Sequence, residues 1–126
     1  MRKVWIAVTL LVAVIASVES AEAVLDMDLM QNIEDLNKSL SSNIALKDGK
    51  ASTADAKELN QLFGTVEHFF VVKGDAQNAV DLSKKSKDLT VEIINAVAAN
   101  KFDVATDSAT SLSRTCRACH TFYKKE

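Results

Sequence analysis

Two cysteines and a histidine lie within five residues near the end of the chain, in the stretch "CRACH" at residues 116–120. On a helix, residues three apart share a face, so Cys116 and Cys119 would point the same way. His120 follows immediately. This C-x-x-C-H spacing is typical of covalent haem attachment: both thiols bond to vinyl groups on one edge of the porphyrin, and the imidazole binds the iron. The motif predicts one covalently attached haem c.

Three other uses of these side chains have weaker support. A disulfide between Cys116 and Cys119 would close a very small loop and stabilise little, even in an oxidising compartment. A redox-active dithiol typically lies near the start of a helix in a βαβ unit, whereas this motif lies near the end of a predicted helix. A zinc site needs a fourth ligand, and the only other histidine is His68.

The elements that must position this motif are predicted to be helices. Apolar residues recur at spacings of three and four, and the chain has no proline and only three glycines. We expect helices over about residues 25–45, 53–72 and 76–99, and a fourth whose apolar stripe runs from Phe102 to Tyr123. Short connections favour antiparallel neighbours. The expected fold is all-α, an antiparallel up-down-up-down four-helix bundle with covalently bound haem.

Local signals predict where these helices begin and end. Gly49 is expected to end the first helix in the left-handed conformation, and Gly74 to break the second. Ser52 and Asp55 have the spacing of a capping box at the start of the second helix. Asp75 can cap the third helix.

The last helix has the clearest apolar stripe. Its members are separated by three, four, three, four, three and four residues: Phe102, Ala105, Ala109, Leu112, Cys116, Cys119 and Tyr123. Both cysteines therefore lie on the inward face of this helix. The small side chains of Ala105 and Ala109 leave space between the helices, which a bulky group would fill.

The first 23 residues have the three parts of a secretory signal peptide. A basic start "MRK" precedes the apolar run "VWIAVTLLVAVIA", and "SVESAEA" offers an A-x-A cleavage site ending at Ala23. The run is shorter than the roughly 20 residues that cross a bilayer, although an uncleaved membrane anchor is the alternative. We therefore expect an exported, periplasmic protein with one domain at residues 24–126 and no membrane attachment after cleavage.

The charge and the remaining side chains exclude other classes of function. A net charge of -2 argues against nucleic-acid binding, which normally needs a basic surplus. The sequence offers no Ser-His-Asp set and no glycine-rich phosphate loop. We therefore expect a protein that is not an enzyme.

With the signal peptide, the four helices and the C-terminal "CRACHTFYKK", the chain resembles the class II cytochromes c, the family of cytochrome c-prime and its low-spin relatives. Members often have an aromatic residue three positions after the ligating histidine and a basic residue next. Tyr123 and Lys124 stand there. The resemblance covers the whole predicted mature chain and implies a four-helix bundle with the iron bound by His120.

The family divides on the other side of the iron, where low-spin members use a methionine of the first helix. Met30, with Ile33 at plus three and Lys38 at plus eight, stands in a similar frame. A shift of one turn would put Ile33 over the iron and leave it five-coordinate, and Met27 is a third possibility. His68 is expected to be a surface or partly buried residue.

The resemblance implies a periplasmic monohaem cytochrome that transfers electrons to and from redox partner proteins, with iron held by His120 and Met30. A thioether on the iron raises its potential and closes the site. The alternative is a five-coordinate protein similar to cytochrome c-prime that binds a gas such as nitric oxide. The sequence leaves open whether the protein is a monomer or a homodimer.

Overall fold

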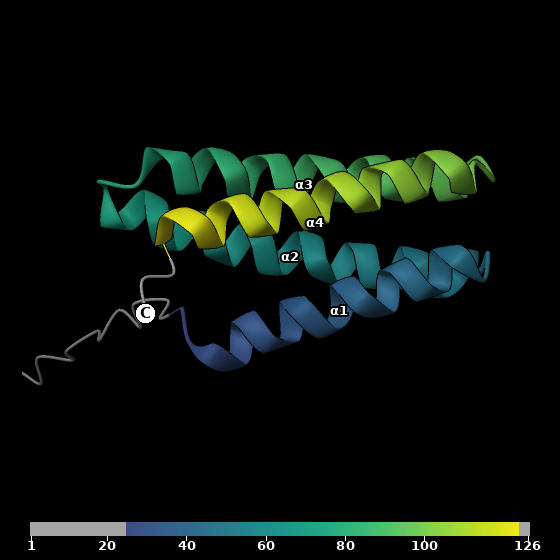
Figure 1. Cartoon of the computed structure of the whole chain (residues 1–126), viewed down its shortest axis with the longest axis horizontal. Helices are drawn as coiled ribbons and strands as arrows, with labels where there is room; N and C mark the ends of the chain where they lie inside the picture. The colour runs from purple at the N-terminus through teal and green to yellow at the C-terminus, as the bar shows by residue number, and fades with distance from the viewer. Residues whose placement is uncertain (1–24, 124–126) are drawn as a thin grey trace, which may run out of the picture.

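The computed structural model describes residues 25–123, which form four helices packed side by side without a strand in that range (Figure 1). The helices are α1 (Met27–Ala45), α2 (Gly49–Lys73), α3 (Gln77–Ala98) and α4 (Phe102–Tyr123). Both α1 and α3 pack against α2 and α4. The predicted all-α four-helix bundle is confirmed. The predicted signal peptide at residues 1–23 and Lys124 lie outside the described residues.

The core runs along the centre of the bundle and takes side chains from every helix. Leu40, Leu59, Ile93 and Leu112, one from each helix, are completely buried. Each of the four stands three or four residues from other apolar residues of its own helix, so this spacing identifies the inward faces. None of the helices within residues 25–123 is long and apolar enough to cross a membrane.

Replacing Leu40 with alanine should lower the free energy of unfolding by about 3 kcal/mol, because the lost methyl groups leave a cavity in a packed core. The matched control is Leu46→Ala in the connection after α1, where 75% of the side chain is exposed and 0% of Leu40 is. Urea unfolding of the purified variants measures both changes. Equal losses for the two variants would show that Leu40 is not a core residue in solution.

The prediction that Gly49 ends the first helix is wrong, because Gly49 is the first residue of α2. Lys47 adopts the left-handed conformation after α1, with φ at 56°. Asp48 then caps α2, and its Oδ1 accepts the N–H of Ala51 at 3.0 Å. A carboxylate there satisfies a free backbone donor and interacts favourably with the helix dipole, so α2 starts earlier than predicted.

The predicted capping box of Ser52 and Asp55 is wrong for the same reason, since both residues lie inside α2. Ser52 is buried, and its hydroxyl has no hydrogen-bond partner among residues 25–123. Asp55 instead binds α1: its Oδ2 accepts from Ser39 Oγ and from Asn43 Nδ2, each at 2.8 Å. A residue that looked like a local cap therefore joins two helices.

The connection between α2 and α3 agrees with the sequence only in part. Gly74 ends α2 in the left-handed conformation with φ at 81°, as predicted. Asp75 does not cap α3. The N-cap residue is Ala76, which has no side-chain hydrogen bond to the helix.

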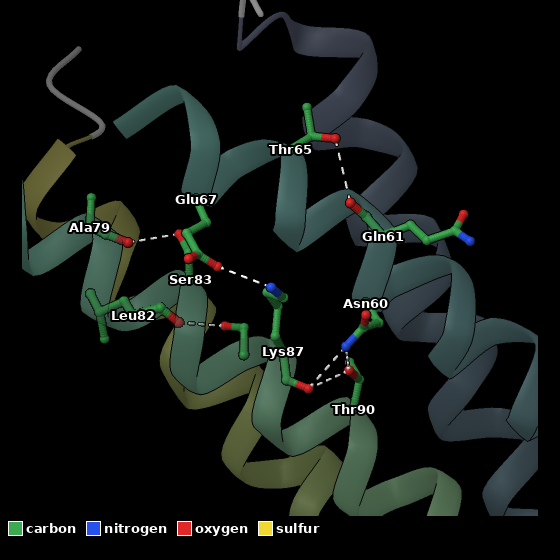
Figure 2. A network of polar contacts seen from close by, with 10 residues as sticks. Asn60, Gln61, Thr65, Glu67, Ala79, Leu82, Ser83, Lys87 and Thr90 are labelled. Carbon is green, nitrogen blue, oxygen red and sulfur yellow. Dashed lines mark hydrogen bonds and ion pairs between the residues drawn. The ribbon is translucent and has the colours of Figure 1, made fainter. Parts of the chain in front are cut away.

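Polar side chains join α2 to α3 along one side of the bundle (Figure 2). Asn60 Nδ2 donates to Thr90 Oγ1 at 2.9 Å and to the Lys87 carbonyl at 3.2 Å. Further along α2, Glu67 accepts from Lys87 Nζ at 3.2 Å in a partly buried ion pair. These contacts hold α2 and α3 in one register.

Candidate functional site

The last two turns of α4 carry Cys116, Cys119 and His120. Both thiols are half-buried, and Cys116 packs against the core, while His120 is exposed. Two threonine hydroxyls beside the motif donate hydrogen bonds to backbone carbonyls of the preceding turn. Thr115 Oγ1 donates to the Ser111 carbonyl and Thr121 Oγ1 to the Arg117 carbonyl, each at 3.0 Å. The helix is therefore continuous through the motif, and both thiols lie on one face.

The two thiols are free within the described part of the chain, so they do not form the disulfide considered above. Burial raises the pKa of Cys116 to about 11, and a charge on Cys119 would add to that rise. Burial also raises the pKa of Cys119. Both groups are protonated at neutral pH. A redox-active dithiol depends on a lowered thiol pKa, so this environment does not favour that use of the motif.

The methionines of α1 differ in their surroundings. Met30 is half-buried and packs against the core, whereas 88% of Met27 is exposed. Ile33, one turn further along, is buried. His68 is exposed on α2, as expected from the sequence. Among the candidates for a second iron ligand, Met27 and His68 are exposed, whereas Met30 is half-buried.

The start of α1 and the end of α4 lie at the same end of the bundle, where the ribbon of α1 leans away from α4 (Figure 1). Burial along α1 follows this divergence. Ile33, Leu40 and Ile44 are buried, whereas Leu29 and Met30, nearer the start of the helix, are only partly covered. The apolar side chains near the motif are thus the least enclosed of this helix.

A hollow of about 260 Å³ lies between α1 and α4 further from this end. It is lined by Ser41, Ile44, Thr106, Ala109, Thr110, Ser113 and Arg117. The sequence predicted space beside Ala105 and Ala109. Ala109 does line this hollow, whereas Ala105 is completely buried against other helices.

Sequence reasoning missed one contact of this interface. Asn37 Nδ2 on α1 donates to Ser113 Oγ on α4 at 3.1 Å. Asn37 Oδ1 is buried and has no hydrogen-bond partner among residues 25–123. The sequence offers little signal for this contact, because Leu36 beside Asn37 continues the apolar spacing of three and four between Ile33 and Leu40.

Within residues 25–123, no three histidine, cysteine, aspartate or glutamate side chains form a group that could hold a metal ion. The iron of a haem needs no such group, because the porphyrin supplies four of its ligands and the protein one or two. No protein-family model, curated protein or solved structure matches this chain.

Proposed function

We propose that the chain is an exported, periplasmic c-type cytochrome that transfers electrons, with one haem attached through Cys116 and Cys119. The observation that carries this proposal is the arrangement on α4: two half-buried thiols on one face, followed at once by the exposed imidazole of His120. The first half of α1, with the partly covered Met30, lies at the same end of the bundle (Figure 1).

The proposed bundle is antiparallel, with an up-down-up-down order. Contacts between α2 and α3 support this order, because the partner of Asn60 is Thr90, whereas Glu67, later on α2, pairs with the earlier Lys87. The colours of Figure 1 run in opposite directions along neighbouring helices. The connections of three residues are too short to return a chain along the length of such helices.

The two thiols, the imidazole and the thioether at this site are the groups that hold a haem in a c-type cytochrome. Cys116 and Cys119 are protonated thiols, each able to add across a vinyl group, with sulfur forming a thioether and its hydrogen moving to the other vinyl carbon. His120 is free to turn its imidazole toward an iron, and Met30 offers a thioether from the facing helix. When bound, the haem supplies an iron that changes between the ferrous and ferric states.

The residues around this site suit electron transfer more than catalysis. A Met30 thioether would raise the potential and close the side of the iron opposite His120, so ligation would be the same in both oxidation states. The exposure of His120 indicates that the site reaches the surface. The partner would be another redox protein that binds through a small, transient interface.

A second candidate function rests on Ile33. This side chain is 6% exposed, better buried than Met30, and one turn away on α1. If Ile33 instead of Met30 covered the iron, the iron would be five-coordinate. The protein would then bind a small gas such as nitric oxide.

The exported protein can be tested directly after expression with a cytochrome maturation apparatus. We expect the mass of residues 24–126 plus one haem, a low-spin ferric spectrum with the weak red band of a methionine–iron bond, and a reversible one-electron titration. Ferrous protein should bind carbon monoxide poorly.

Two results would contradict different parts of the proposal. A colourless protein with free or oxidised thiols would exclude a c-type cytochrome altogether. A high-spin spectrum with rapid carbon monoxide binding would retain the haem but replace electron transfer with gas binding.

A further inference from the structure

Five residues of α1 follow one another at spacings of three, four, three and four: Met30, Ile33, Asn37, Leu40 and Ile44. Ile33, Leu40 and Ile44 are buried in the core. Leu36 packs against the core between Ile33 and Leu40, and Asn37 beside it is half-buried at the interface with α4. An amide at such a position needs a reason.

The contacts of Asn37 indicate that it does not optimise stability. It makes one hydrogen bond across the interface, from Nδ2 to Ser113 Oγ at 3.1 Å, while its buried Oδ1 has no partner among residues 25–123. Leaving a buried acceptor unpaired costs free energy. In coiled coils, a single asparagine on the apolar stripe fixes the register of packed helices at the expense of stability, and half-buried Asn37, with its buried Oδ1, is comparable.

Helix geometry relates this bridge to the proposed iron ligands. Met30 lies seven residues before Asn37, and His120 lies seven residues after Ser113. Seven residues advance a helix by about 10.5 Å and return it to nearly the same face. In the proposed antiparallel order, Met30 and His120 therefore stand at the same height along the bundle axis when Asn37 is bonded to Ser113.

The same count of residues along the two helices distinguishes the alternatives for the second iron ligand. Ile33 comes level with Arg117, about one turn from His120, and Met27 comes level with Tyr123. A slip of one turn between α1 and α4 would exchange Met30 for Ile33 opposite the histidine. Such a slip would break the hydrogen bond of Asn37 and bury its amide without any partner.

We infer that Asn37 and Ser113 are positioning residues that fix the register of α1 against α4, so that Met30 reaches the iron held by His120. This inference rests on the proposed function. Leu29 and Met30 at the start of α1 are only partly buried, and the bridge between Asn37 and Ser113 joins α1 to α4 further along the helix.

The test replaces Asn37 with leucine in the haem-loaded protein. We expect the methionine–iron band to weaken and the affinity of ferric iron for added imidazole to rise about tenfold, which corresponds to about 1.4 kcal/mol. The matched control is Asn60→Leu, which removes a similar asparagine–hydroxyl bridge, to Thr90, in the interface between α2 and α3 (Figure 2). This control should leave the band and the imidazole affinity unchanged.

Ser113→Ala, with Thr90→Ala as its control, makes the same comparison if the leucine variant does not mature. A double-mutant cycle of Asn37→Leu and Ser113→Ala in urea unfolding should also give a coupling between the two residues.

The outcomes distinguish this inference from the function on which it rests. If the wild-type protein lacks the methionine–iron band, the proposed ligation is wrong. If that band is present but both interface pairs change imidazole affinity equally, or neither does, the positioning role of Asn37 and Ser113 is wrong.

Discussion

The double variant Cys116→Ala, Cys119→Ala should contain no covalently bound haem, and its yield in the periplasm should fall sharply. The two thiols are the only groups of the chain that can form thioether bonds to a porphyrin, because the sequence contains no other cysteine. Mass spectrometry of the exported chain and a haem stain after denaturing electrophoresis measure the loss directly.

The matched control for this variant is Arg117→Lys, which changes an exposed residue inside the motif and keeps both thiols and the histidine. It should mature to the wild-type mass. Normal amounts of folded, haem-free protein from the double cysteine variant would show that the bundle does not depend on the cofactor. A covalent haem on that variant would rule out attachment at these residues.

Met30→Ala is expected to have the second-largest effect. Loss of the thioether should remove the red absorption band, lower the reduction potential and open one side of the iron. Imidazole would then no longer have to displace a ligand, so its affinity for ferric iron should rise on the order of 100-fold, equivalent to about 2.8 kcal/mol. Equilibrium titration and redox potentiometry measure the two changes.

Met27→Ala is the control for this change, because it removes the same side chain three residues earlier, where 88% of it is exposed. It should leave the spectrum, the potential and the imidazole affinity as in the wild type. If Met27→Ala removes the band and Met30→Ala does not, the ligand has been assigned one turn too far along α1, and the register inferred from Asn37 and Ser113 fails as well.

Helix ends show how far local signals can be trusted in this chain. Gly74 was predicted correctly, because a glycine adopts the left-handed conformation without the steric cost that a Cβ brings. Gly49 and Ser52 were predicted wrongly, because Asp48 caps α2 four residues earlier and Ser52 is buried in the core. Asp48 and Ser52, four residues apart, could each cap the helix, and the packing of Ser52 in the core leaves Asp48 as the cap.

The sequence by itself determined the number of helices, their inward faces and the grouping of Cys116, Cys119 and His120. All of these depend on residues within a few positions of one another, and the geometry of a single helix relates such residues directly. It left Met30, Ile33 and Met27 as alternatives for the opposite side of the iron, since a stripe at spacings of three and four looks the same after a shift of one turn.

Only the tertiary structure decided how α1 lies against α4. It shows Asn37 bonded to Ser113, 76 positions away in the chain, and it shows Met30 partly covered while Met27 is exposed. The physical reason is that the register between two helices is set by contacts across their interface. The periodicity of either helix alone contains no information about which residue of one stands beside which residue of the other.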